Sequence, residues 1–385
     1  MMKRPKIVAD DKIPFLRGVL EPYADMVYLP GARISPADAS DADAILTRTR
    51  TRCDAGLLDN SRVSLIATAT IGYDHIDTAY CEAKNIRWVN APGCNSSSVQ
   101  QYITAALTMW AKNSGVPLSE STLGIIGVGN VGSKVAKAGA ALGMRVLLND
   151  PPRADKEGTE SFVALNELLR ESDVVTCHTP LTQDGLYPTF HLASDAFFEQ
   201  MKAGAVYINS SRGAVTDSAA LKRAIQTKLS AFILDVWEGE PQLDPVLLEK
   251  AFIATPHIAG YSADGKANGT AACVREINAF FHLGLPADWY PEAVPPPPMP
   301  TQWSIDCEGK TVEQVFYEAV THTYPIWEDS ERLKQSPGSF EKQRGDYWTR
   351  REFESFSLNL SHADEKTVSG LQTVGFKINR HTKSI

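Results

Sequence analysis

The chain has 385 residues, of which 43% are hydrophobic and 22% charged, and its formal net charge is −8 at pH 7. This length predicts two or three domains, and this composition is that of a globular protein with a sizeable core. The acidic balance argues against a nucleic acid or an anionic membrane surface as a partner.

The 6 cysteines form no C-x-x-C pair, and their spacing predicts neither a zinc site nor a disulfide framework. The first residues lack the apolar core of a signal peptide, and no apolar run approaches the ~20 residues that span a bilayer. We therefore expect a reduced, cytoplasmic protein.

The first hundred residues alternate short apolar runs with helical patterns, which predicts a parallel α/β sheet. The expected strands cover residues 6–10, 26–30, 44–47, 64–70 and 86–90. A long helix is expected over residues 98–113, with Ser97 or Ser98 as its N-cap.

A second α/β unit begins near Thr122. Its expected strands and helices cover residues 123–126, 133–142 (helix), 145–150, 173–180, 205–211, 231–237, 252–260 and 270–284 (helix). The Pro-rich stretch 295–300 predicts a stiff linker. The segment beyond it is too short for easy independence, so we expect it to be stabilised by association. It begins with an amphipathic helix whose apolar face carries Val312, Val315, Phe316, Ala319 and Val320.

The strongest local signal is a G-x-G-x-x-G turn at residues 127–132, between a predicted strand and a predicted helix. Such glycines let backbone N–H groups approach a pyrophosphate at the start of the helix. The next strand ends in Asp150, which would bind the adenosine ribose and repel a 2′-phosphate, so we expect NAD rather than NADP, although Arg153 nearby weakens that preference. A glycine turn without a ligand is the alternative. The predicted cofactor contacts in the turn are Gly127, Gly129, Asn130, Val131 and Gly132.

Three polar motifs follow predicted strands of this second unit: NSSRGAVTD with Arg212, LDVWEGEP with Glu240, and TPHIAGYS with His257. The carboxyl ends of parallel strands meet at one ligand crevice, so these side chains are expected to converge.

These residue types suit the oxidation of a 2-hydroxy acid. An arginine can grip a carboxylate, a histidine can accept the hydroxyl proton, and a glutamate can orient the histidine. The hydride then passes to a nicotinamide, which needs no metal. Any one of these residues alone is more often a surface ion pair or a structural group, and their joint occurrence carries the prediction.

The motifs resemble those of the D-isomer-specific 2-hydroxyacid dehydrogenases, in the same order, over about residues 5–290. The resemblance implies two Rossmann-like or flavodoxin-like α/β domains with parallel sheets, plus a small C-terminal α+β dimerisation domain. The implied division is 1–97 with 258–290 for substrate, 98–257 for NAD, and 291–385 for dimerisation. Arg212, Glu240 and His257 are implied as the catalytic residues.

The match narrows to a branch of this family that oxidises 4-phospho-D-erythronate during pyridoxal 5′-phosphate (vitamin B6) biosynthesis. The run RGDYWTRREFESF at 344–356 resembles the homodimerisation domain of that branch. The narrower resemblance implies substrate contacts at Thr49, Thr70 and Tyr261. It implies NAD contacts at Asp150, Thr179, Asp235 and Gly260.

The run TRTRTR at residues 47–52 follows the third predicted strand, where an anion site would serve the substrate phosphate. The run resembles an Arg-Ser/Thr pattern of related enzymes with phosphorylated substrates, which implies Arg48 and Thr49 in that role and leaves open which arginine of 48–52 contacts the phosphate. Arg50 and Arg52 would share a face with Arg48 only if the strand continued, and Arg52 is expected to be solvated.

Two alternatives remain open at this point. The first is another phosphorylated 2-hydroxyacid dehydrogenase, such as a 3-phosphoglycerate dehydrogenase, although such enzymes often end in a different tail. The second is a non-enzymatic NAD-sensing interaction protein of the same fold, for which the sequence shows no peptide-docking feature.

Overall fold

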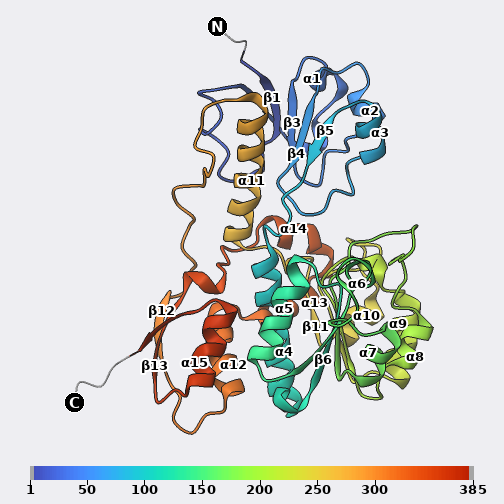
Figure 1. Ribbon diagram of the computed structural model, residues 1–385, viewed down its shortest axis with the longest axis vertical. Coiled ribbons are helices and arrows are strands. Elements are labelled where there is room, and N and C mark those ends of the chain that lie inside the picture. Colours follow the sequence, from blue (N-terminus) through green and yellow to red (C-terminus); the bar gives the residue numbers. More distant parts are fainter. Residues whose placement is uncertain (1–3, 381–385) are drawn as a thin grey trace. The chain divides into compact units, whose positions relative to one another are not determined.

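The computed structural model describes residues 4–380, which form two compact units (Figure 1). The first unit holds the described part of Met1–Asn95 together with Ser262–Pro295, and the second holds Ser96–Tyr261 with the described part of Pro296–Ile385. The chain passes back to the second unit at Pro295, inside the predicted Pro-rich linker. Within residues 4–380, no helix is both long and apolar enough to cross a membrane.

The first unit is built on a five-stranded parallel sheet with the order β2-β1-β3-β4-β5. Neighbouring residues of β1 point to opposite faces: Ile7 joins the core under α11, and Val8 joins the core under the short helices. The elements are β1 (Lys6–Asp10), β2 (Asp25–Leu29), α1 (Pro36–Ala39), β3 (Ala44–Thr47), α2 (Ala55–Leu58), β4 (Leu65–Thr68), α3 (Thr78–Ala83), β5 (Arg87–Val89) and α11 (Ala263–Phe281).

The second unit contains a six-stranded parallel sheet with the order β11-β10-β9-β8-β6-β7, so the strand order reverses between β6 and β8. Helices α4 and α5 cover one face, and α7 to α10 cover the other. The elements are α4 (Ser96–Ser114), β6 (Thr122–Ile126), α5 (Asn130–Ala141), β7 (Arg145–Asn149), α6 (Pro151–Glu157), α7 (Leu165–Glu171), β8 (Val174–Cys177), α8 (Asp195–Gln200), β9 (Val206–Asn209), α9 (Ser218–Thr227), β10 (Ala231–Leu234), α10 (Pro245–Lys250) and β11 (Ile253–Ala254).

The rest of the second unit is a small three-stranded parallel sheet with the order β12-β13-β14 and its helices. Together with the two larger sheets, it confirms the predicted fold class. The elements are β12 (Gln302–Asp306), α12 (Val312–Thr323), α13 (Ile326–Gln335), α14 (Phe340–Gly345), β13 (Ser357–Ser361), α15 (Glu365–Val374) and β14 (Lys377–Arg380).

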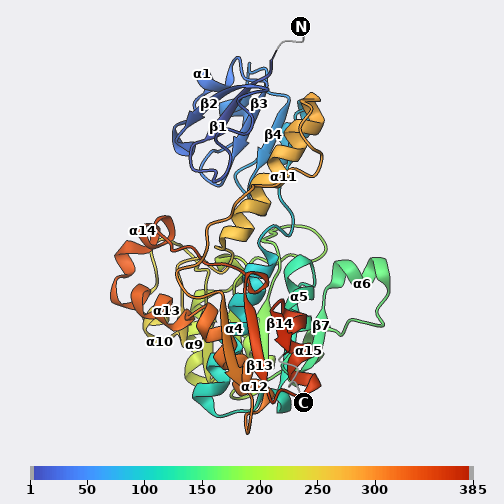
Figure 2. The same cartoon turned by 90° about the vertical axis from the view of Figure 1, so that its left-hand side faces the viewer.

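The small sheet and the six-stranded sheet share one hydrophobic core. Helix α12 packs on α4 and α15 packs on α5 (Figure 2), and α13 packs on β11. One apolar cluster therefore contains Ile103 of α4, Phe316 of α12 and Leu371 of α15, all of them buried. The C-terminal segment is thus stabilised by packing against the rest of its own unit.

Several predicted boundaries were wrong, among them those of α4, β11 and α11. Helix α4 begins at Ser96, so Ser97 and Ser98 lie inside the helix instead of capping it. Strand β11 has two residues, because the chain after it turns away from the sheet to bond Asp235. Helix α11 begins at Ala263, seven positions before the predicted start at residue 270, with Ser262 accepting a hydrogen bond from Gly265 as its N-cap.

Replacing Phe316 by alanine should lower the free energy of unfolding by about 3–5 kcal/mol, because the side chain is fully buried. Since the core is shared, the whole second unit should lose stability together. Urea unfolding followed by circular dichroism measures the free energy of unfolding, and NADH fluorescence in the same titration shows whether cofactor binding is lost in the same transition. Trp327→Ala, at an exposed aromatic, is the control. A separate early transition that leaves NADH binding intact would contradict the shared core.

Candidate active site

The glycine turn lies where the predicted cofactor site requires it, between β6 and α5 at the point where strand order reverses. Helix α5 begins at Asn130, so the amide groups of its first turn face the turn from the carboxyl edge of the sheet. A Cβ on Gly132 would lie 2.0 Å from the Gly127 carbonyl oxygen, so only glycine lets the helix pack this closely. A Cβ on Gly129 would meet nothing within 4 Å, which leaves that side of the turn open.

Asp150 lies at the carboxyl end of β7 and faces the same turn. Its Oδ2 accepts a hydrogen bond from the Val128 amide at 2.7 Å, and its Oδ1 accepts one from the Arg153 amide at 3.1 Å. The guanidinium of Arg153 is already engaged, with two hydrogen bonds to Glu157 and one to the Val128 carbonyl. An arginine held in this way is poorly placed to recruit a 2′-phosphate, which favours NAD over NADP.

Two buried hydroxyl groups that follow strands of this sheet fit a polar ligand. Thr179 follows β8 and lies against Gly127, whose Cβ would be 3.0 Å from Thr179 Cγ2. Ser210 follows β9. In the described part of the chain, neither hydroxyl has a hydrogen-bond partner. Buried hydroxyls are nearly always bonded, so both are suited to meet a bound cofactor. Ser210 was missed from the sequence, where nothing in NSSRG distinguishes it from Ser211.

The loop after β11 is held by the buried carboxylate of Asp235. Asp235 Oδ1 accepts hydrogen bonds from the Thr255 hydroxyl at 2.7 Å and the Ile258 amide at 2.8 Å, and Oδ2 accepts one from the Ala259 amide at 2.9 Å. Both carboxylate oxygens of Asp235 therefore accept hydrogen bonds from this loop. His257, at φ 55, has a left-handed backbone that a non-glycine residue adopts only where its surroundings hold it.

His257 and Glu240 form the predicted pair. The Nδ1 of His257 lies 2.6 Å from Glu240 Oε1, and Glu240 Oε2 accepts a hydrogen bond from the Trp237 amide at 3.1 Å. Burial alone would raise the pKa of Glu240, but the hydrogen bond and charge of His257, the Trp237 amide and the charge of Arg344 together hold it below its ordinary value. Glu240 is thus ionised at neutral pH and fixes the ring, leaving Nε2 as the nitrogen that exchanges a proton.

Arg212 lies in the loop after β9, and that loop touches the loop of Glu240. A Cβ on Gly213 would be 2.1 Å from the Trp237 carbonyl oxygen, so glycine is required for this close approach. The Nη1 of Arg212 donates to the Ser211 carbonyl at 2.9 Å, and the Arg212 carbonyl accepts from Asn209. The structure therefore brings the Arg212 loop beside the Glu240 loop of the same unit.

The substrate residues predicted near the N-terminus lie in the first unit, at the carboxyl ends of β3 and β4. Thr68 Oγ1 links the Arg48 carbonyl, at 3.3 Å, to Thr70 Oγ1, at 2.8 Å. The Arg48 guanidinium donates to the Lys12 carbonyl, and Thr49 is exposed. Because β3 ends at Thr47, the alternation of TRTRTR does not continue.

The remaining members of that run have structural roles or lie in water. Thr51 is buried and its hydroxyl donates to the Gly31 carbonyl at 2.9 Å. The side chain of Arg52 is 85% exposed and pairs with Asp54, as expected for a solvated residue.

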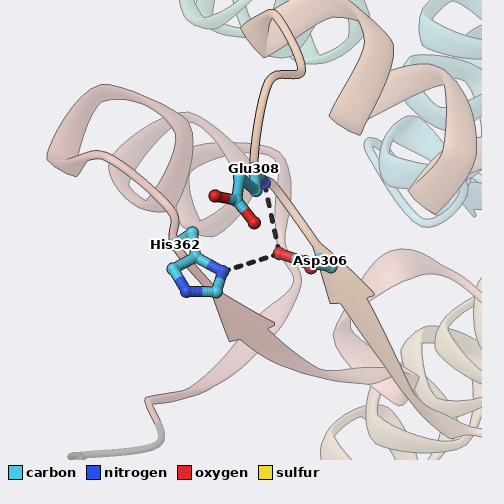
Figure 3. Close-up of side chains that lie close together, drawn as sticks. All are labelled: Asp306, Glu308 and His362. Carbon is cyan, nitrogen blue, oxygen red and sulfur yellow. Dashed lines mark hydrogen bonds and ion pairs between the residues drawn. The ribbon is translucent and has the colours of Figure 1, made fainter.

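A second cluster of ionisable side chains lies in the small C-terminal sheet. Asp306, Glu308 and His362 are all exposed, at the ends of β12 and β13 (Figure 3). Asp306 Oδ1 lies 2.8 Å from His362 Nδ1 and accepts from the Glu308 amide at 3.2 Å, and the His362 bond is the main reason why the pKa of Asp306 falls to about 2. These contacts describe a surface ion pair at strand ends, and we assign it no catalytic role.

Comparison with known proteins agrees with an NAD-dependent dehydrogenase, the class of enzyme that the glycine turn and the Glu240–His257 pair suggest. A family model described as "D-isomer specific 2-hydroxyacid dehydrogenase, NAD binding domain" matches residues 97–259. A second, described as "Domain of unknown function (DUF3410)", matches residues 295–375. Among solved structures, a D-lactate dehydrogenase from Aquifex aeolicus, complexed with NAD and lactic acid, is 29% identical at a TM-score of 0.60. The match covers 72% of this chain and 95% of that one.

Curated relatives narrow the family further. The erythronate-4-phosphate dehydrogenase of Bacteroides fragilis is 47% identical over 359 residues, which cover 92% of this chain and 99% of the relative. That of Cronobacter sakazakii is 38% identical, covering 98% and 99%. The chain belongs to the erythronate-4-phosphate dehydrogenase family, and residues 97–259 form its NAD-binding domain.

Replacing Gly132 by alanine should weaken NADH binding about tenfold or more, because the new Cβ would force the helix away from the Gly127 carbonyl. A fluorescence titration measures the affinity. Gly338→Ala, at a position where a Cβ meets nothing within 4 Å, is the matched control. Equal NADH affinities in the two variants would show that this turn does not bind the cofactor.

Proposed function

We propose that this protein oxidises 4-phospho-D-erythronate to 2-oxo-3-hydroxy-4-phosphobutanoate with NAD, in pyridoxal 5′-phosphate biosynthesis. The observation that carries the proposal is the 2.6 Å contact between His257 and Glu240, in a chain 47% identical to a named erythronate-4-phosphate dehydrogenase. The similarity covers nearly the full length, including the C-terminal segment, and so extends beyond the part that other 2-hydroxyacid dehydrogenases share.

The residues of this chain divide the work of the oxidation. Arg212 binds the substrate carboxylate through two parallel hydrogen bonds and polarises the reacting C2 oxygen. The Nε2 of His257 accepts the C2 hydroxyl proton, and Glu240 stabilises the imidazolium that forms. NAD bound at the glycine turn would supply the nicotinamide that takes up the hydride from C2. One hydroxyl proton and one hydride are removed, and C2 becomes a carbonyl carbon.

Cofactor binding is assigned to the open glycine turn and the groups around it. The amides of Gly129, Asn130 and Val131 are proposed to bind the pyrophosphate, and Asp150 the ribose. Further contacts are proposed at Gly127, Gly132, Thr179, Asp235 and Gly260.

The alternatives are weakened by different observations. A 3-phosphoglycerate dehydrogenase from Entamoeba histolytica is 24% identical at a TM-score of 0.62, a likeness of fold alone. The contact between Glu240 and His257 favours an enzyme over a non-enzymatic NAD-sensing protein, because a sensor needs no proton acceptor.

The purified protein should reduce NAD in the presence of 4-phosphoerythronate, with a larger kcat/KM than for 3-phosphoglycerate. Nicotinamide absorbance follows the reaction. His257→Ala should lower kcat about 10²- to 10⁴-fold, because the proton acceptor is lost. His191→Ala, which removes a histidine paired with Glu238 at the same 2.6 Å, is the control. Turnover of neither substrate would refute a dehydrogenase of this class.

Replacing Arg48 by alanine should raise the KM for 4-phosphoerythronate about 10- to 100-fold, because a charged hydrogen bond to the phosphate is lost. Unphosphorylated erythronate should be affected little. Arg52→Ala is the matched control, since that arginine is solvated. Equal effects on both substrates would remove Arg48 from the phosphate site, while Thr49, Thr70 and Tyr261 would keep their proposed substrate contacts.

We also propose that the protein is a cytoplasmic homodimer assembled through residues 291–385, because the run at 344–356 resembles the homodimerisation domain of this family. Truncation at Pro295 would be a poor test, because it would uncover the apolar surfaces of α4 and α5. Sedimentation of the full-length chain measures the assembly directly.

A further inference from the structure

Two arginines of the C-terminal segment contact the loop that carries the catalytic histidine. Arg350 Nη2 donates to the carbonyl oxygens of Ile258, at 3.2 Å, and Ala259. Arg344 Nη2 donates to the Tyr261 hydroxyl at 3.0 Å. All of these residues belong to the second unit. Residues 257–261, called the histidine loop below, are therefore bound from two sides, by Asp235 and by the C-terminal segment.

Arg350 and Asp235 act on the same peptide group. The peptide that joins Ile258 to Ala259 donates its N–H to Asp235 Oδ2 at 2.9 Å and accepts from Arg350 through its C=O at 3.2 Å. The dipole of this peptide is thus aligned between a buried anion and a buried cation, which strengthens both hydrogen bonds. Arg350 is fully buried, with its guanidinium 4.3 Å from the centre of the Tyr324 ring, so it is held in one place.

This arrangement bears on His257, because its left-handed backbone immediately precedes the bonded peptides. The His257 amide donates to the Asp235 carbonyl at 2.7 Å. Hydrogen bonds with Asp235 and Arg350 therefore restrain the main chain of His257, Ile258 and Ala259 in succession. A shift of Ile258 would move the imidazole away from Glu240.

Arg344 makes the corresponding contact at the far end of the loop. Its side chain is 17% exposed, its guanidinium lies 5.6 Å from the Tyr261 ring, and Nη1 pairs with Glu341 on the same helix. Its positive charge is also among the causes that keep the pKa of Glu240 low, after His257 and the Trp237 amide.

We propose that Arg344 and Arg350 are positioning residues for the reaction: Arg350 fixes the main chain that follows His257, and Arg344 fixes the Tyr261 side chain. The C-terminal segment thereby takes part in turnover by its own chain, separately from any role in assembly. The assignment of Tyr261 to the substrate rests on the proposed function.

The test uses full-length variants that differ in one contact. Arg350→Lys shortens the reach to the two carbonyls, and Arg344→Ala removes the bond to Tyr261. Lys342→Ala is the matched control, because Lys342 lies on the same helix as Arg344 and pairs at the surface with Asp346. Hydrogen exchange of the histidine-loop amides, the kinetics of 4-phosphoerythronate oxidation, and NADH affinity are measured for each.

Arg350→Lys should speed exchange of the Ile258 and Ala259 amides. Both arginine variants should lower kcat/KM about tenfold, with NADH affinity within about twofold of the unchanged protein. Arg344→Lys should recover part of the loss, because an ammonium can still donate to Tyr261. In a Tyr261→Phe background, Arg344→Ala should add little, since both changes remove the same bond.

Exchange and kinetics like those of Lys342→Ala would overturn the proposal. If Arg350→Lys does not fold, Arg344→Ala and Tyr261→Phe decide the proposal. Additive effects of these two changes on kcat/KM would count against it. A wild-type protein that fails to oxidise 4-phosphoerythronate would contradict the proposed function instead, and the exchange comparison would still test the restraint on the loop.

Discussion

A single buried carboxylate organises the catalytic edge of the second unit. Asp235 is 1% exposed, and a carboxylate removed from water is tolerated only with hydrogen bonds and a compensating charge. The bonds come from Thr255, Ile258 and Ala259, and the charge comes from Arg350 across the intervening peptide. Satisfying this carboxylate ends β11 after two residues and turns the chain into the loop that presents His257 to Glu240.

The same constraint explains why the C-terminal segment packs where it does. Its helices complete the core on the α4 and α5 face of the NAD-binding domain, and its arginines reach the loop at the edge of that domain. The part of the chain that matches a family model of unknown function thus completes the core of the second unit and bonds the loop of its catalytic histidine. The proposed substrate residues Arg48 and Thr70, in contrast, come from the other unit, which has cores of its own.

Sequence patterns predicted the elements whose bounds depend on neighbouring residues alone. Strands β1 and β3 were found at their observed bounds because each is a short apolar run closed by polar residues. The start of α11 was missed because ADGKANG contains two glycines and little apolar periodicity. The pairing of Glu240 with His257 was predictable from strand ends, and the structure confirms it. Arg344 and Arg350 were not predictable, because they lie 83 and 92 positions from their loop partners, and only the packing of α13 and α14 brings them there.

The shared core also dictates the order in which the chain can mature on a ribosome. Residues 96–261 emerge before residues 296–385, with the apolar faces of α4 and α5 already made. Their partners, α12 and α15, are synthesised only near the end, and α15 finishes at Val374. The apolar outer faces of α4 and α5 must therefore wait for almost the whole chain before they are covered, which exposes the nascent protein to chaperones and to aggregation throughout that interval.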